Sequence, residues 1–150
     1  MIALDTNLVV YAHRSGTAEH TAAQRAIEDA CNSRGGCGVA VQTVAEFWSV
    51  VTHPAAAGGP SSPDAAARFL RALEDDGGVQ VFTPGPGFAA RLVQTAVDLK
   101  VRGPRVFDLQ IALCAMDGGA TELWTRDEGF VKVPGLRIRN PLAMRKGSHD

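Results

Sequence analysis

The chain opens with MIALDTN (residues 1–7), in which a short apolar run ends at the acidic residue Asp5. Three more acids lie at the same kind of place: Glu46 after VAVQTVA, Asp108 after RVF, and Asp127 after TELWT. If these runs are neighbouring parallel strands, the carboxylates meet at one edge of the sheet, where open α/β folds place their sites. Converging carboxylates need a positive partner, so the pattern favours a divalent metal ion.

Each acid also fits a plain structural role. Asp5 and Asp108 fit helix N-caps, and Asp127 fits a turn. Thr43 and Glu46 have the spacing of a capping box, in which Thr43 caps the helix and Glu46 reaches back to the backbone N–H of Thr43. Caps explain each acid singly but not the set of four. The segment LQIALCAM after Asp108 carries no charge, so a carboxylate leading it should be partly buried.

Length and composition restrict the class of protein. With 150 residues the chain fits a single domain over 1–150. A formal net charge of −1 excludes a globally basic coat for nucleic acid, though not a local basic patch. The odd number of cysteines (Cys31, Cys37 and Cys114), without C-x-x-C spacing, argues against a disulfide framework and a structural zinc. We expect buried, reduced cysteines in a soluble cytoplasmic protein, because neither a signal peptide nor a membrane-spanning run is present.

Short apolar runs alternate with helical patterns along the chain. Right-handed crossovers between such strands predict an α/β fold, a three-layer α/β/α sandwich with a central parallel sheet. The helix after the PGPG turn should be amphipathic, with an apolar face formed by Phe88, Leu92, Val93, Ala96 and Leu99. We expect strands at 1–4, 38–41, 79–82, 121–125 and 136–138, and helices at 7–13, 18–33, 43–51, 63–75, 88–99 and 108–117.

Short motifs follow one another in a definite order: LDTN at 4–7, AEF at 45–47, DLQIA at 108–112, TRDEGF at 125–130, VPGL at 133–136 and NP at 140–141. Together they resemble the PIN-domain ribonucleases, and within that superfamily the VapC-type toxins of bacterial toxin–antitoxin pairs. The resemblance covers the whole chain. Each motif alone is weak, but several in this order and at these spacings are a strong signal.

The resemblance implies that four acids are catalytic and hold one or two Mg²⁺ or Mn²⁺ ions: Asp5, Glu46, Asp108 and Asp127. It also implies that Thr6 or Asn7 in the first motif, and Thr125 in the last, orient ligands or phosphate. Gly129 stands where many relatives carry another acid, so a second metal site is expected to be weak. The implied reaction is endonucleolytic cleavage of structured RNA by metal-activated water, without a nucleophilic side chain.

Basic side chains are the candidates for RNA contact, chiefly Arg102, Arg105 and Arg126. A solvated surface explains each one equally well, as it does the further candidates Lys100, Lys132, Arg137, Arg139, Arg145 and Lys146. The resemblance also implies a homodimer and a cognate antitoxin. The antitoxin tail would lie in a groove between the helices at 18–33 and 43–51, against Val44, Phe47 and Trp48.

Three rival functions are weighed from the sequence. A catalytically silent PIN-fold binding module would keep the fold without cleaving RNA, although all four acids are present here. Another Mg²⁺-dependent phosphohydrolase is disfavoured, because residues 5–7 (DTN) lack the second aspartate of the D-x-D phosphatase pattern. A nucleotide binder is weaker still, since no glycine-rich phosphate loop follows the first strand.

Overall fold

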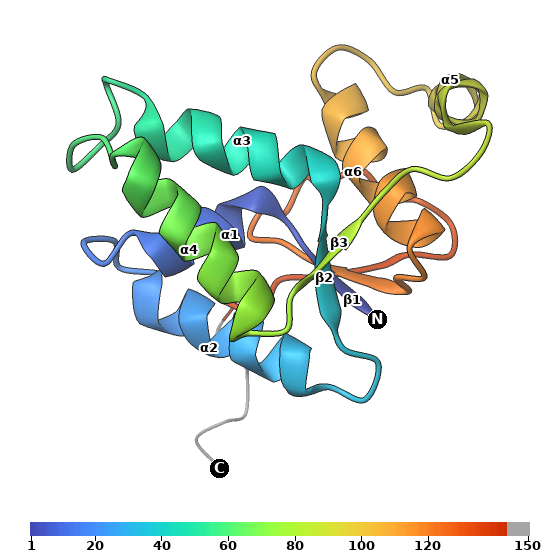
Figure 1. Cartoon of the computed structure of the whole chain (residues 1–150). Helices are drawn as coiled ribbons and strands as arrows, with labels where there is room; N and C mark the ends of the chain where they lie inside the picture. Colours follow the sequence, from blue (N-terminus) through green and yellow to red (C-terminus); the bar gives the residue numbers. More distant parts are fainter. Residues whose placement is uncertain (144–150) are drawn as a thin grey trace.

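A computed structural model describes residues 1–143, which form five strands and six helices. All neighbouring strands are parallel, in the order β3-β2-β1-β4-β5. The first strand of the chain is therefore the centre of the sheet (Figure 1). The strands are β1 (Ile2–Leu4), β2 (Cys37–Ala40), β3 (Gln80–Phe82), β4 (Glu122–Trp124) and β5 (Arg137–Arg139).

Four helices cover one face of this sheet (Figure 1). Their apolar faces pack on Leu4, Val39 and Trp124 in one buried cluster. Helix α4 starts as the sequence predicts, because the Ser62 hydroxyl accepts a hydrogen bond from the Ala65 N–H and proline stands at its first turn. The four are α1 (Thr6–His13), α2 (His20–Asn32), α3 (Val41–Thr52) and α4 (Pro63–Asp75).

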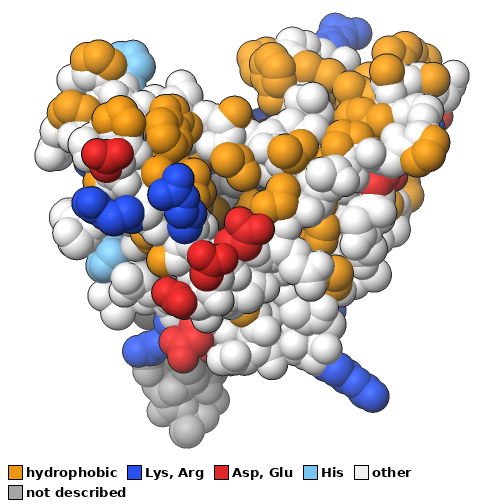
Figure 2. Space-filling model, viewed as in Figure 1, with side chains coloured by type: hydrophobic (Ala, Val, Ile, Leu, Met, Phe, Trp, Pro, Cys, Tyr) orange, Lys and Arg blue, Asp and Glu red, His pale blue; other side chains and the backbone are white. Residues whose placement is uncertain are grey.

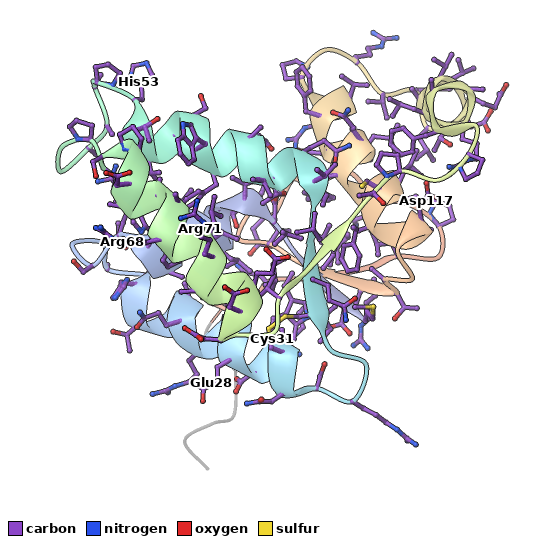
Figure 3. All side chains as sticks on the ribbon, in the orientation of Figure 1. Glu28, Cys31, His53, Arg68, Arg71 and Asp117 are labelled. Atoms are coloured by element: carbon purple, nitrogen blue, oxygen red, sulfur yellow. A yellow bond between two sulfur atoms is a disulfide. The ribbon has the colours of Figure 1, made fainter. Side chains whose placement is uncertain are left out.

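Helices α5 (Phe88–Asp98) and α6 (Arg105–Asp117) cover the opposite face. Helix α6 is the more buried of the two, with Leu109, Ala112 and Cys114 fully buried. Asp117 at the end of α6 pairs with Arg91 of α5 at 2.7 Å, close to the turn that follows β3 (Figure 3). The predicted three-layer α/β/α sandwich is confirmed.

Two helices begin at least two residues earlier than predicted. Helix α3 starts at Val41, directly after β2, so Thr43 and Glu46 lie inside it and form no capping box. Helix α6 starts at Arg105, so Asp108 lies in its first turn and is not a cap. In both cases the preceding residue, Ala40 or Pro104, lacks a capping side chain. The sequence rules look for such a side chain, and these helices begin without one.

The amphipathic helix α5 is less buried than its pattern predicts. Phe88, Leu92, Ala96 and Leu99 pack against the core, but the side chain of Val93 is 64% exposed. On the opposite face of the sheet Phe47 is fully buried, whereas the neighbouring Trp48 is 37% exposed. No helix within residues 1–143 combines the length and apolar character that a membrane crossing requires.

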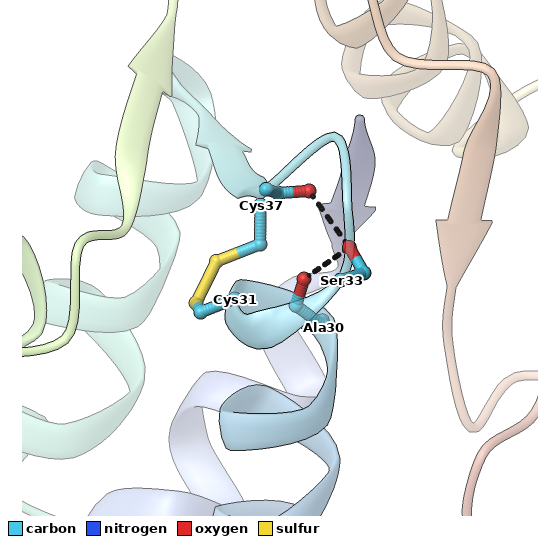
Figure 4. Close-up of a disulfide and its surroundings, with 5 residues drawn as sticks. Ala30, Cys31, Ser33 and Cys37 are labelled. Atoms are coloured by element: carbon cyan, nitrogen blue, oxygen red, sulfur yellow. Dashed lines mark hydrogen bonds between the residues drawn. A yellow bond between two sulfur atoms is a disulfide. The ribbon is translucent and has the colours of Figure 1, made fainter.

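The expectation of three reduced cysteines is wrong for two of them. Cys31 at the end of α2 and Cys37 at the start of β2 form a disulfide (Figure 4). The turn between them reverses the chain at Gly36, whose φ is +78°, and this brings the two Cα atoms to 4.6 Å. Spacing rules miss such a pair because they do not include the turn. Cys114 is free and buried, as predicted.

Candidate active site

Asp5 lies at the carboxyl end of the central strand. The sheet register pairs Leu4 with Trp124, so Asp5 and Thr125 are neighbours where β1 and β4 end. The Thr125 hydroxyl donates to Asp5 Oδ2 at 2.7 Å, and the Thr6 N–H donates to Asp5 Oδ1 at 2.8 Å. Asp5 is also the N-cap of α1, so the capping and site interpretations hold together for this residue.

Burial dominates the electrostatics of Asp5, which is only 8% exposed. Loss of solvent raises its pKa to about 6, and Asp108 and Glu46 nearby add to the rise. The hydrogen bonds from Thr125 and Thr6 act against it, because they favour the ionised carboxylate. A buried carboxylate without a cationic partner is therefore costly to ionise here.

Glu46 reaches the same place from α3, one turn along from Thr43. Its Oε1 accepts a hydrogen bond from the Thr6 hydroxyl at 3.2 Å, and that hydroxyl lies 3.3 Å from the Thr43 hydroxyl. Burial raises the pKa of Glu46, and Asp108 adds to the rise. We call Asp5 and Glu46 the inner acids. Thr43 is a supporting residue that the sequence analysis assigned to a cap instead.

Asp108 and Asp127 form a second, more open group that we call the outer acids. Asp108 is half-buried, in line with the prediction from the apolar segment that follows it. Arg105 connects the two, because its Nη1 lies 3.0 Å from Asp108 Oδ2 and 3.2 Å from Asp127 Oδ2. Asp127 also closes the predicted turn by accepting a hydrogen bond from the Gly129 N–H at 2.8 Å.

Three of the four predicted acids line one cleft of about 340 Å³. We call it the acidic cleft. Asp127 lies at its margin, joined to it through Arg105 and through its own N–H, which donates to the Thr125 hydroxyl at 3.0 Å. The cleft is lined by Asp5, Glu46 and Asp108, with Thr6, Asn7, Val10, Tyr11, Val50 and Ile111.

The donor set of the acidic cleft consists of carboxylate, hydroxyl and amide oxygens, which suit a hard cation such as Mg²⁺ or Mn²⁺. Within residues 1–143 no three acidic, histidine or cysteine side chains lie close enough to hold an ion as they stand. Mg²⁺ needs only one or two carboxylates, with water completing its shell, so the oxygen donors present are compatible with it.

The predicted supporting residues meet around Asp5. Asn7 donates from its amide to the Thr125 hydroxyl at 3.1 Å and accepts from the Arg126 N–H at 3.3 Å. Thr6 and Thr125 donate hydrogen bonds to Asp5, and the Thr6 hydroxyl also donates to Glu46. Thr6, Asn7 and Thr125 therefore belong to one network with the acids.

The three arginines predicted to contact RNA do not share one place. Arg102 and Arg105 line a second cleft of about 420 Å³, which we call the basic cleft. Its lining includes Leu99, Lys100, Val101, Gly129, Val131 and Lys132. Arg126 instead bonds Glu19 at 2.7 Å and the Tyr11 hydroxyl at 2.9 Å. Arg145 and Lys146 lie outside the described residues.

The groove expected between α2 and α3 differs from the prediction. Helix α1 contacts both of these helices, and Phe47 is fully buried, so it offers no surface to a partner. Trp48 and Val50 of α3 are exposed instead, at 37% and 49%. Val50 lines the acidic cleft together with Val10 of α1. An apolar strip therefore borders the acids.

Comparison with known proteins agrees with this arrangement. The sequence model described as "PIN domain" matches residues 2–136. Ribonuclease VapC43 of Mycobacterium tuberculosis is 31% identical over 142 residues, which cover 95% of this chain and 96% of that protein. Ribonuclease VapC48 of the same species is 25% identical over 139 residues, covering 93% and 96%.

A solved structure has the same fold at lower sequence identity. The crystal structure of Mycobacterium tuberculosis VapC20, a sarcin-ricin loop cleaving toxin, superposes with a TM-score of 0.63 at 17% identity, covering 89% of this chain and 98% of that one. From the family match over most of its length and the 31% identical ribonuclease, the chain belongs to the PIN domain family, among its VapC-type ribonucleases.

Proposed function

We propose that this protein is a Mg²⁺- or Mn²⁺-dependent endoribonuclease that acts in the cytoplasm as the toxin of a toxin–antitoxin pair. The observation that carries the proposal is the acidic cleft, in which Asp5, Glu46 and Asp108 meet at the carboxyl edge of a parallel sheet. Such edges are where open α/β folds place their sites. Membership of the VapC-type ribonucleases supports RNA as the substrate.

In this proposal the metal is held by Asp5, Glu46 and Asp108, with Asp127 at the margin as the fourth acid. A divalent ion, when bound, supplies activation of water and neutralisation of charge at phosphorus. The chain itself fixes the geometry. The hydroxyls of Thr125 and Thr6 each bond one inner acid, so the carboxylates are oriented before metal or substrate arrives.

The basic cleft is the proposed path of the RNA backbone. It presents Lys100, Arg102 and Lys132 beside Arg105, which reaches the outer acids. A chain with net charge −1 must bind a polyanion through such a local patch. Arg126 contributes less in this scheme, because Glu19 already pairs with its guanidinium.

The direct test is RNA cleavage with Mn²⁺, with EDTA, and with the Asp5→Asn variant. We expect cleavage only by wild-type protein with metal. Arg91→Gln is a matched control, since Arg91 pairs with Asp117 at the far end of α6, away from the acids. Undiminished cleavage in EDTA by a contaminant-free preparation would overturn the metal dependence. A folded wild-type protein that binds RNA without cleaving it under any divalent ion would favour the silent binding module.

A cognate antitoxin is the proposed protein partner. VapBC2 from Rickettsia felis has been solved bound to a DNA fragment from its promoter, and its fold superposes on this chain with a TM-score of 0.62 at 19% identity. Here Val10 and Val50 line the acidic cleft beside the acids, and Trp48 is a further exposed apolar side chain of α3. A tail with apolar anchors and one basic residue would match that surface. Trp48→Ala should weaken antitoxin binding, whereas Val93→Ala on α5 should not.

The proposed homodimer uses the exposed apolar surface of α5 and the start of α6. Hydrophobic side chains gather over α5 and the start of α6 (Figure 2). Val93, Val97 and Phe107 there are 64%, 66% and 60% exposed, and a shallow groove of about 450 Å³ runs beside the first two. Exposed apolar area of this kind marks protein contact surfaces. Val97→Glu should yield a monomer by sedimentation, and an unchanged dimer would place the interface elsewhere.

A further inference from the structure

We propose that Arg105 is a resident cation that takes the place of a second metal ion, so that the site holds a single divalent ion on the side of Asp5, Glu46 and Asp108. Asp127 is then a partner of Arg105 and not a metal ligand. The inference rests on the proposed metal-dependent function and specifies how its charge is balanced.

Arg105 lies between the two outer acids. A single nitrogen, Nη1, lies within 3.2 Å of one oxygen from each outer acid. That is the place where a cation bridging Asp108 and Asp127 would lie. A second metal ion at those two carboxylates would have to displace the guanidinium, because both cannot occupy the space between the same oxygens.

Both carboxylate oxygens of Asp127 already have partners within the protein. Its Oδ2 meets Arg105, and its Oδ1 accepts the Gly129 N–H at 2.8 Å. Both oxygens therefore have a donor from the chain. The inner acids differ, since only hydroxyl, amide and backbone N–H groups bond them. The uncompensated negative charge thus lies on the Asp5 side, and a divalent ion gains more there.

Gly129 leaves the space that the Arg105 guanidinium occupies, because it has no side chain. A Cβ at this position would lie 2.7 Å from Arg105 Nη2 and 3.4 Å from its Cζ. Any side chain at residue 129 would therefore crowd this end of the guanidinium and require it to shift. The glycine at residue 129 and the position of the Arg105 guanidinium therefore depend on each other.

Binding of Mn²⁺ to the full-length protein, followed by the electron paramagnetic resonance signal of the free ion, tests the proposal without an activity assay. We expect one ion per chain in wild type and a second in Arg105→Gln. Asp5→Asn should weaken the first ion more than about tenfold, and Asp127→Asn less than about threefold. Gly129→Ala keeps every charge but forces the guanidinium to shift, so a second ion should bind this variant more tightly than it binds wild type.

Arg102→Gln is the matched control, because it removes the same charge from the basic cleft and Arg102 makes no salt bridge to an acid of residues 1–143. It should bind Mn²⁺ like wild type. Two ions of similar affinity in wild type, equal stoichiometry in wild type and Arg105→Gln, or equal gains from the two arginine variants would each overturn the inference. A wild-type protein that binds no Mn²⁺ would instead overturn the proposed metal dependence itself. Circular dichroism of every variant confirms that the fold is retained.

Discussion

The inner and outer acids carry the same carboxylate groups, yet their charges are compensated in different ways. Asp5 is buried and bonded by hydroxyl, amide and backbone N–H groups, and its pKa is raised to about 6. Asp108 and Asp127 are more exposed and share the guanidinium of Arg105. Acids that converge at one sheet edge therefore need not bind a cation equally well. A metal ion gains little binding free energy at carboxylates whose charge Arg105 already neutralises.

The largest difference between the inner and outer acids is expected in the rate of RNA cleavage. Asp5→Asn should lower the rate of RNA cleavage more than about a hundredfold, because even residues that only support a metal ligand contribute 10–100-fold. Asp127→Asn should lose only about tenfold or less, since it removes a partner of Arg105. Single-turnover cleavage of one RNA at saturating Mn²⁺ measures both. Equal losses for the two variants would show that the inner and outer acids act alike.

The pH dependence of stability should distinguish the two groups in metal-free protein. The pKa of Asp5 is raised from 3.8 to about 6. The folded state therefore binds this proton more tightly than the unfolded state, and stability falls as pH rises from about 4 to about 6. The loss is on the order of 3 kcal/mol for a shift of this size. The shift of Glu46 has the same sign.

Urea unfolding in EDTA between pH 4 and 7.5 measures this effect. Asp5→Asn should be more stable than wild type at pH 7 and should lack most of the decline, because asparagine still caps α1 and carries no charge. Asp108→Asn is the comparison variant, and it should gain nothing, since it takes one partner from Arg105. An Asp5→Asn protein less stable than wild type at pH 7 would mean that the cap outweighs the buried charge.

Metal stabilisation should follow the same division. Mn²⁺ at a hundredfold excess over its Kd should stabilise wild type by about 2.7 kcal/mol, because it binds only the folded state. Asp127→Asn should keep nearly all of this gain, and Asp5→Asn should lose most of it. Thermal melts with Mn²⁺ and with EDTA give the two values. If Mn²⁺ did not stabilise the wild-type protein, the four acids would be better interpreted as separate structural residues.

The smallest expected effect concerns the two arginines of the basic cleft. Arg102→Ala should lower the salt dependence of RNA affinity by about 0.7 in the logarithmic slope, the value for one phosphate contact on a single strand. Arg105→Ala should change the slope less, because its guanidinium is already neutralised by the outer acids. Fluorescence anisotropy over a salt series gives both slopes. A larger change for Arg105 would show that it leaves the acids to bind RNA.

The alternation of strands and helices, and with it the parallel sheet, could be predicted from the sequence. Apolar runs ending at Asp5 and Thr125 are local signals, and parallel pairing of β1 with β4 then brings these two residues together. Asp5 and Asp127 likewise follow strands β1 and β4, whereas Glu46 and Asp108 lie inside helices α3 and α6. Glu46 joined them although its predicted cap was wrong, because α3 starts directly from β2.

The groups that compensate the charge of each acid could not be predicted, because they come from other elements of the fold. No local pattern indicates that Arg105, predicted to contact RNA, meets Asp127, which lies 22 residues away, or that Gly129 leaves it room. The Cys31–Cys37 disulfide likewise depends on how the turn at Gly36 joins α2 to β2. Periodicity reports which face of an element is buried, whereas charge pairing depends on distances between elements. Those distances are set only when the layers pack.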